Sequence, residues 1–178
     1  MTHLVDGDIR LEPLSAEHGD AMDELARGDG VARFTRVPVP VPDGFGAAWV
    51  DRYVRGREAG TQAGFAILDA TSDEFLGFVA LVKLELEMQE AEAGYIVAEQ
   101  ARGRGVATRA LRLLTAWAFD EFRLERIELL MSAENHGSEL VAQRCGYTRE
   151  GVLRSIYFKQ GMRDDTIVYS MLRHEHGT

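Results

Sequence analysis

The chain has 178 residues, 46% of them hydrophobic, which predicts one domain (residues 1–178) with a single sizeable core. Its formal net charge of −9 disfavours nucleic acid and anionic membranes as partners, because the long-range field of the protein repels both. The chain has a single cysteine, Cys145, which excludes an intrachain disulfide and a cysteine-based zinc cluster, so no metal is expected. It has no run of eighteen apolar residues, which predicts that it has no membrane span, and we expect a cytoplasmic location.

Hydrophobic periodicity and turn residues predict alternating strands and helices. Ser15 is expected to cap the first helix. Three prolines spaced by valines predict an extended loop whose valines lie against other parts of the protein. The elements expected, in chain order, are strand 5–14, helix 16–27, loop 37–46, helix 45–58, strands 63–69, 75–84 and 93–98, helix 105–122, strand 126–131, helix 138–145, and two strands around 147–158 and 165–172.

This order predicts a mixed α/β fold. The strands at 63–69 and 75–84 are expected to form an antiparallel hairpin, whereas the strand at 93–98, the helix at 105–122 and the strand at 126–131 are expected to form a βαβ unit. In the long helix, apolar residues recur at spacings of three and four and mark the face that packs on the sheet: Ala107, Ala110, Leu111, Leu114, Trp117 and Ala118.

A glycine-rich turn at residues 100–108 joins the strand at 93–98 to the long helix. Backbone N–H groups at a helix N-terminus have no partner within the helix, and the helix dipole attracts anions. Two glycines remove side chains that would block close approach of a pyrophosphate, the small residues at 107 and 108 leave the first helical turn accessible, and two arginines can add charge at the rim. The turn residues concerned are Arg102, Gly103, Arg104, Gly105, Val106, Ala107 and Thr108.

The residues of this turn leave other interpretations open. A P-loop would need a Gly-Lys-Ser/Thr ending, and the turn contains no lysine. A dinucleotide-binding fingerprint is closer, since Gly103 and Gly105 match its first two glycines and Glu128 follows at about the right distance, although Thr108 replaces the third glycine. An ordinary glycine-containing loop at the start of a helix is the remaining alternative.

Several motifs, in order, resemble those of the GNAT N-acetyltransferase superfamily. The family's cofactor signature, Arg/Gln-x-x-Gly-x-Gly/Ala, reads here Arg102-Gly103-Arg104-Gly105-Val106-Ala107; Gly94-Tyr95-Ile96-Val97 precedes it, and Arg126-Ile127-Glu128-Leu129, Asn135-x-x-Ser138 and Gly146-Tyr147 follow. The ending, Glu150-Gly151-Val152-Leu153-Arg154 and then residues 161–170, resembles the RimJ/RimL-type branch, which acetylates ribosomal-protein N-termini. The resemblance covers most of the chain and is weakest over residues 28–60.

The resemblance implies a GNAT-type fold: a central mixed, mostly antiparallel sheet with a splayed βαβ cofactor unit, flanked by helices. It also implies that acetyl-CoA is the cosubstrate and that a primary amine, on a protein N-terminus or a small molecule, attacks it directly. A homodimer could help to shape the acceptor groove. The alternative is an acyl-CoA-binding regulatory module without turnover, because Ala142 stands where many relatives carry a tyrosine proton donor.

The resemblance also assigns residues to the cofactor. In the family, the strand before the glycine turn pairs with the pantetheine arm and points an N–H at the thioester oxygen; by position this implies Ile96 and Val97. The main-chain N–H groups of about residues 103–108 would hold the pyrophosphate. Asn135 resembles the asparagine whose side-chain amide meets the pantetheine arm, and its alternative is a helix-terminal or turn residue.

Acetyl transfer to an amine also needs a proton for the departing thiolate and a route for the amine proton. Ser138 resembles the serine proposed as proton donor in the ribosomal-protein branch, and a capping serine is its alternative. Glu92 is the candidate general base, and a solvated surface acid is its alternative. The neighbouring acids Glu85, Glu87 and Glu90 could instead attract a cationic acceptor.

Five other residues have mainly structural interpretations. Cys145 is expected as a buried thiol rather than an acyl carrier, and His136 as a loop histidine. His174 and His176 form at most a weak metal site near the end of the chain. Trp49 is expected in the core, although it and the proline-valine loop could line the acceptor pocket.

Overall fold

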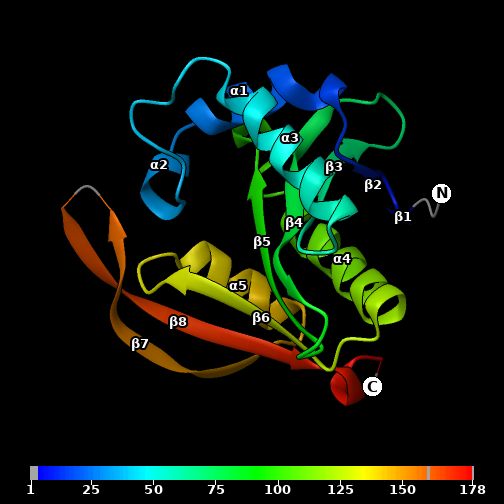
Figure 1. Cartoon of the computed structure of the whole chain (residues 1–178), viewed down its shortest axis with the longest axis vertical. Helices are drawn as coiled ribbons and strands as arrows, with labels where there is room; N and C mark the ends of the chain where they lie inside the picture. The colour runs from blue at the N-terminus through cyan, green and yellow to red at the C-terminus, as the bar shows by residue number, and fades with distance from the viewer. Residues whose placement is uncertain (1–3, 160, 178) are drawn as a thin grey trace.

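The computed structural model describes residues 4–159 and 161–177 (Figure 1). Its strands are β1 (Leu4–Asp6), β2 (Ile9–Pro13), β3 (Ala63–Asp69), β4 (Phe75–Glu85), β5 (Glu90–Val97), β6 (Arg126–Ser132), β7 (Thr148–Lys159) and β8 (Met162–Leu172). Its α-helices are α1 (Gly19–Arg27), α2 (Val31–Phe34), α3 (Phe45–Glu58), α4 (Val106–Phe122) and α5 (His136–Arg144). Within the described residues, no helix is long and apolar enough to cross a membrane.

The strands form one sheet in the order β1-β2-β3-β4-β5-β6-β8-β7. Neighbouring strands are antiparallel except β5 and β6, which are parallel because α4 connects them as a crossover. The parallel pairing runs only from Glu90, opposite Arg126, to Ala93, opposite Leu129. Both strands continue beyond these pairs and diverge, as Figure 1 shows. The mixed, splayed sheet that the family resemblance implied is therefore confirmed.

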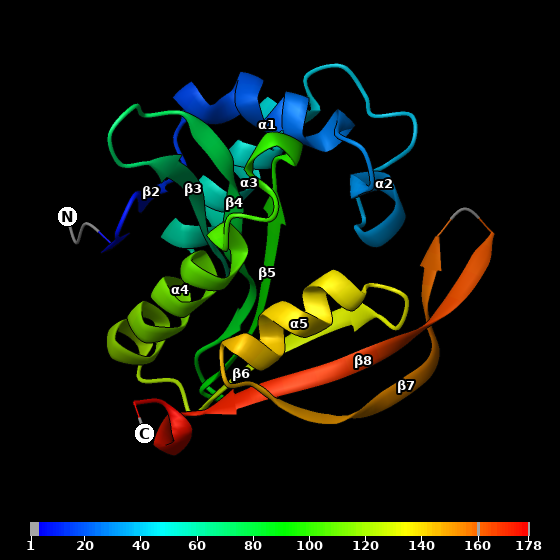
Figure 2. The ribbon, with the colours of Figure 1, turned by 180° about the vertical axis from the view of Figure 1, so that it is seen from behind.

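Alternation along the central strands divides the core into two layers. In β3, Phe65 and Ile67 pack in the cluster beneath α4, whereas Ala66 and Leu68 pack in the cluster beneath α1 and α3. Successive side chains of a strand point to opposite faces, so both faces of β3 are covered. Figure 1 shows α3 on one face of the sheet, and Figure 2, turned by 180°, shows α4 and α5 on the other.

Helix α4 is held to its sheet face by the apolar stripe that the sequence predicts. Leu111 and Leu114 are fully buried, and the ring of Trp117 meets the ring of Phe65 edge-on at 4.9 Å between centroids. Gly105, in the left-handed conformation, precedes the first helical residue. The apolar stripe therefore fixes the direction of α4, whose N-terminal end points at the opening between β5 and β6.

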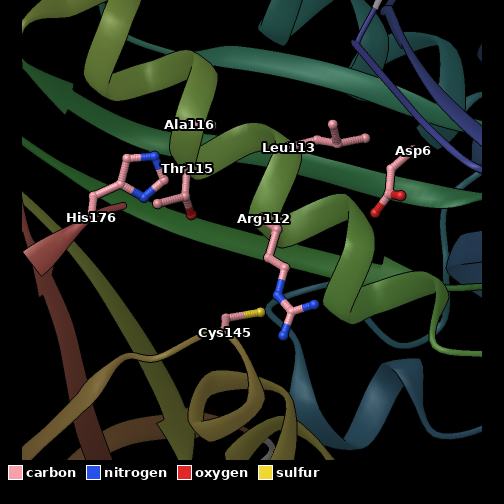
Figure 3. Close-up of a pocket in the computed structure, with 7 residues that line it drawn as sticks. All are labelled: Asp6, Arg112, Leu113, Thr115, Ala116, Cys145 and His176. Carbon is pink, nitrogen blue, oxygen red and sulfur yellow. The ribbon is translucent and has the colours of Figure 1, made fainter. Parts of the chain in front are cut away.

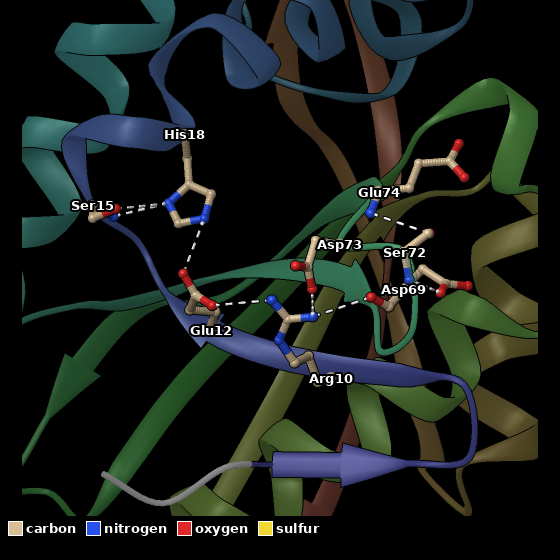
Figure 4. A network of polar contacts seen from close by, with 8 residues as sticks. All are labelled: Arg10, Glu12, Ser15, His18, Asp69, Ser72, Asp73 and Glu74. Carbon is tan, nitrogen blue, oxygen red and sulfur yellow. Dashed lines mark hydrogen bonds and ion pairs between the residues drawn. The ribbon is translucent and has the colours of Figure 1, made fainter.

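A polar network ties the start of the chain to the turn between β3 and β4 (Figure 4). The guanidinium of Arg10 donates to the main-chain oxygen of Asp69 at 3.1 Å and to Oδ1 of Asp73 at 2.6 Å, and it pairs with Glu12 at 3.3 Å. Glu12 in turn lies 3.6 Å from Nε2 of His18, just before α1. The network anchors the β2 edge of the sheet and the entry into the first helix.

Two expectations for the N-terminal segment were wrong in detail. The single strand expected over 5–14 is two strands, β1 and β2, because the chain reverses at Gly7, whose φ of 61° lies in the left-handed region that glycine tolerates. The helix expected over 16–27 begins with a 3-10 turn, Ala16–His18, preceded by Ser15 as its N-cap, and becomes α-helical only at Gly19. Helix α2 was not predicted, because four residues are too few to show a helical period.

Other element boundaries also differ from the prediction; β8, for example, begins at Met162 rather than near residue 165. Strand β5 begins at Glu90 rather than at residue 93, because its acidic residues still pair across the hairpin with β4 and with Arg126 of β6. Helix α5 begins at His136, two residues before Ser138, and its N-cap is Asn135. The valine-rich loop is irregular rather than extended, with bends at residues 39–40 and a turn at 43–44; Val37 is buried against Ala26 and Val31, as expected, whereas Val39 is exposed.

Candidate active site

A cleft of about 1160 Å³ opens where β5 and β6 separate. We call the cofactor end the part of the lining that comes from the first turn of α4, the second half of β5 and the start of α5. We call the acceptor end the part that comes from residues 34–37, residues 45–53 of α3, the later part of β4, Glu92 and the Ile156–Tyr157 portion of β7. Segments far apart in the sequence thus meet around one space, because the sheet splits there.

The first turn of α4 presents free hydrogen-bond donors to the cleft. Val106, Ala107 and Thr108 line it, and none of their N–H groups has a hydrogen-bond acceptor among the described residues. Gly103 and Gly105 have φ values of 76° and 75°, and no atom lies within 4 Å of the place where a Cβ would be. The turn therefore needs glycine for its conformation and leaves room for an anion, so it fits the pyrophosphate of a coenzyme.

The two arginines of the turn lie differently. Arg102 lines the cleft, and its guanidinium donates to the main-chain oxygens of Val97, at 3.2 Å, and Asp29, at 2.9 Å. It therefore links the end of β5 to the segment between α1 and α2. Arg104 does not line the cleft, and its side chain reaches Asp8 at 4.0 Å.

Strand β5 offers the cleft an unpaired edge beyond Ala93. The N–H of Ala98 donates to the oxygen of Leu76 at 2.9 Å, so it points toward the β4 side. Because backbone polar groups alternate along a strand, those of Ile96 also point toward β4, and the N–H of Val97 points into the gap toward β6. Of the two residues expected to meet the thioester, Val97 therefore offers its N–H to the cleft, and Ile96 offers its side chain.

The position of Asn135 is compatible with both roles considered for it, a helix cap and a residue that contacts the cofactor. Its Oδ1 accepts a hydrogen bond from the N–H of Ser138 at 3.1 Å, which caps α5, and the residue also lines the cleft. An asparagine side chain has two N–H donors besides its oxygen, so capping leaves the amide nitrogen able to donate to a ligand.

Ser138 lines the cleft and is paired with a residue that the sequence did not indicate. Its Oγ lies 2.6 Å from the Tyr95 hydroxyl, which also reaches the main-chain oxygen of Ser138 at 3.3 Å. Burial raises the pKa of Tyr95 to about 12, and the hydrogen bond to Ser138 opposes this effect. The phenol therefore stays protonated near neutral pH. When it donates to Ser138 Oγ, the serine O–H is free to point into the cleft.

Glu92 lies at the acceptor end and is partly buried. Burial raises its pKa, as does the neighbouring carboxylate of Glu128, whereas Arg36 and Lys83 lower it. A carboxylate with a raised pKa is a better proton acceptor near neutral pH.

The other acids that the sequence offered near Glu92 lie elsewhere. Glu85, Glu87 and Glu90 belong to the β4–β5 hairpin end, and none of them lines the cleft.

Cys145 lies outside the cleft, in a separate pocket of about 340 Å³ beside α4 (Figure 3). Its thiol donates to the main-chain oxygen of Thr108 at 3.3 Å. Burial raises the pKa of Cys145 to about 11, with Arg112 opposing the shift. A protonated thiol turned away from the cleft agrees with a structural role. His176 lines the same pocket.

Sequence reasoning missed most of the acceptor end. Arg36, Arg52, Tyr53 and Tyr157 line it, and the first three belong to residues 28–60, where the family resemblance is weakest. Trp49 fits both of its interpretations, because it lines the cleft and also packs with Phe45 and Phe78, each at 5.3 Å between ring centroids. His136 and His174 are exposed and lie outside the cleft lining.

Comparison with known proteins agrees with this geometry. YdaF of Bacillus subtilis (strain 168), named provisionally as a ribosomal N-acetyltransferase, is 34% identical over 99 residues, which are 56% of this chain and 54% of YdaF. Spermidine N(1)-acetyltransferase of Escherichia coli (strain K12) is 27% identical over 103 residues, which are 58% of this chain and 55% of that protein. The matched stretch thus spans about half the length of these relatives.

Among solved structures, the fold is similar to that of RimL, a ribosomal L7/L12 alpha-N-protein acetyltransferase, in complex with coenzyme A. The TM-score is 0.89 at 19% identity, and the match covers 96% of this chain and 98% of RimL. At this identity the likeness concerns the fold. The acetyltransferase (GNAT) domain family matches residues 8–148, most of the chain. With this match, the ordered motifs and the split sheet, the chain belongs to the GNAT acetyltransferase family.

Proposed function

We propose that this protein is an N-acetyltransferase that moves the acetyl group of acetyl-CoA to a primary amine. The observation that carries the proposal is that one cleft receives donors for a diphosphate, an unpaired strand edge and two groups that can handle protons. The donors are the N–H groups of α4's first turn, and the proton-handling groups are Ser138 and Glu92. Amide formation from a thioester needs each of these.

When bound, acetyl-CoA supplies the acyl group as a thioester. The N–H groups of Val106 to Thr108 hold its diphosphate, and the N–H of Val97 donates to the oxygen on which negative charge develops. Glu92 accepts the proton that the amine loses, and the Ser138 O–H donates to the leaving sulfur. A nitrogen–carbon bond forms as the carbon–sulfur bond breaks; Glu92 then loses its proton to solvent and Ser138 regains one from solvent, so that one proton passes in net from nitrogen to sulfur. Asn135 binds the pantetheine arm through its amide nitrogen.

The test of cofactor binding uses a charge placed among the free donors. Ala107→Glu puts a carboxylate at the α4 N-terminus, and we expect its Kd for CoA, measured by calorimetry, to rise by about tenfold or more, because like charges then face each other. Ala59→Glu adds the same charge at an exposed position outside the cleft and should leave the Kd unchanged. Equal affinity in the two variants would contradict the assignment.

A second candidate function is a CoA-binding module without turnover. Ala142, at the position of the tyrosine found in many relatives, is fully buried in α5, so α5 supplies no phenol there. Release of free CoA from acetyl-CoA, followed with peptides and small amines as acceptors, distinguishes the two candidates. CoA release that depends on the acceptor supports the transferase, and tight CoA binding without release supports the module.

We further propose that residues 1–178 act as one domain, as a homodimer, in the cytoplasm. All strands belong to one sheet, which supports a single domain. The edge strand β7 and its hairpin with β8 carry exposed apolar side chains, which supports a partner there: Val152, Leu153, Ile156 and Met162. Light scattering after size-exclusion chromatography measures the mass, and Ile156→Asp should shift a dimer toward the monomer.

A further inference from the structure

The acceptor end of the cleft carries a charge opposite to that of the whole protein. The chain has a net charge of −9, yet Arg36, Arg52 and Lys83 line this end together with one carboxylate, Glu92. The other acidic residue of the cleft lining, Asp29, lies beside Arg102 of the glycine-rich turn. The acids that could have made it negative, on the β4–β5 hairpin, lie outside the lining. A local excess of cations in an acidic protein points to a role in binding an anion.

Two of these cations form no ion pair with the residues that the structure describes. Lys83 pairs with Glu85 at 3.1 Å. Arg36 and Arg52, in contrast, have no carboxylate within 4.0 Å among the residues of 4–159 and 161–177. Arg52 instead lies over the ring of Tyr53, 4.9 Å from its centroid, a contact that orients the guanidinium and leaves its charge unpaired.

The two arginines come to the acceptor end from different segments. Arg36 follows α2, near Tyr157 of the β7–β8 hairpin, and acts electrostatically on Glu92. Arg52 belongs to α3 and lines the same end of the cleft as Glu92. An amine delivered to Glu92 therefore has Arg36 within electrostatic reach and a second guanidinium, that of Arg52, on the wall of the same cleft.

We propose that the acceptor is a primary amine whose own molecule carries a carboxylate or phosphate near the amine, with Glu92 receiving the amine and Arg36 and Arg52 binding the anion. This rests on the proposed acetyl transfer and names its substrate class. Guanidinium groups bind carboxylates and phosphates in a bidentate manner. A polyamine such as the acceptor of the spermidine relative would bring further positive charges against both arginines and is disfavoured.

The anion has two sources, an acidic residue at the second position of a peptide or a free amino acid-like compound. Both are tested by kcat/KM for CoA release with matched acceptors. The peptide pair is Ser-Glu-Ala-Ala-amide and Ser-Gln-Ala-Ala-amide, the small-molecule pair is β-alanine and β-alaninamide, and spermidine is the cationic arm. We expect the acidic member of at least one pair to be preferred about tenfold at low salt, with spermidine poorest. The preferred pair identifies the source.

Variants attribute the preference to the two arginines. In Arg36→Gln/Arg52→Gln, the ratio of kcat/KM between the acidic and neutral members should fall to about one. Arg55→Gln, on the same helix but outside the cleft and paired with Asp51, should keep the wild-type ratio. Equal use of acidic and neutral acceptors by the wild type, or a preference for spermidine, overturns this inference alone. An absence of CoA release with every acceptor overturns the proposed transferase and this inference with it.

Discussion

Replacing Tyr95 by phenylalanine removes one hydroxyl and keeps the ring, which packs against the main core cluster. The hydroxyl lies 2.6 Å from Ser138 Oγ. A neutral hydrogen bond contributes about 1 kcal/mol, which corresponds to about fivefold in rate if the bond acts only in the transition state. We therefore expect kcat to fall about fivefold while KM for acetyl-CoA stays within about twofold. Tyr95 would then be a positioning residue that orients the proton of Ser138.

The assay is a double-mutant cycle on CoA release. Ser138→Ala should lower kcat by about a hundredfold, typical of a lost proton donor, and Tyr95→Phe should have no further effect in that background. Independent, multiplying effects of the two substitutions would refute the pairing.

Tyr147→Phe is the matched control for this cycle. Its hydroxyl makes a similar bond, 2.7 Å from Thr115 Oγ1, but in the core. We expect it to lower the free energy of unfolding by about 1–3 kcal/mol, because Thr115 is left buried without a partner, and to leave kcat unchanged. A fall in kcat in this variant would mean that loss of a tyrosine hydroxyl anywhere near the helices affects catalysis.

Three further predictions concern single residues. Glu92→Gln should lower kcat by about 10²-fold or more, and wild-type activity in this variant would disprove the role of Glu92 as base. Burial raises the pKa of Glu92, so its ionised form lowers the stability of the wild type as pH rises through the native pKa. Urea unfolding should therefore show the variant to be more stable than the wild type at pH 8 but not at pH 4. Hydrogen bonds from Arg126, the larger cause, and from Ser170 lower the pKa of Glu150 to about 2. The stabilisation by its carboxylate is complete above its ordinary pKa of 4.5 and is lost as pH falls toward 2, so Glu150→Gln should be less stable than the wild type at pH 7 and equal to it near pH 2. A stability difference that stays constant with pH would exclude the ion pair as its cause. A Cβ on Gly46 would lie 2.2 Å from the backbone oxygen of Gly19, so Gly46→Ala should lower the free energy of unfolding by about 1–3 kcal/mol or more. A Cβ on Gly19 would have its nearest atom at 3.6 Å, so Gly19→Ala should change the free energy of unfolding little. Equal melting temperatures of the two variants would contradict this packing.

The sequence predicted well those parts of the fold that depend on local patterns. The long helix, the central hairpin and the glycine turn are specified by periodicity and by residues with special backbone conformations, and they were confirmed. The family motifs add the split sheet, which no local pattern contains. What failed is short or changes direction within a few residues, such as the turn at Gly7 and the single-turn helix α2, because one turn has too few residues to show a period.

The candidate site was predictable to a different degree at its two ends. At the cofactor end, a continuous motif brings its own donors, and the candidates gather there, apart from the Arg104 side chain. Neighbours that come from distant segments were not predictable at either end. At the cofactor end, Tyr95 and Ser138 are 43 residues apart in the sequence, and at the acceptor end Arg36, which follows α2, acts electrostatically on Glu92 of β5. Such contacts depend on tertiary packing, which sequence spacing does not encode.

The short parallel pairing of β5 with β6 has a mechanical consequence. Strands β1 to β5 form one half of the sheet and β6, β8 and β7 the other, and the ladder between the halves extends only from Glu90 to Ala93 on β5. The two halves are therefore joined by few main-chain hydrogen bonds, and amide hydrogens beside this seam should exchange early. A ligand that contacts both halves would hold them together, and at a ligand concentration of one hundred times its Kd it would raise the free energy of unfolding by about 2.7 kcal/mol.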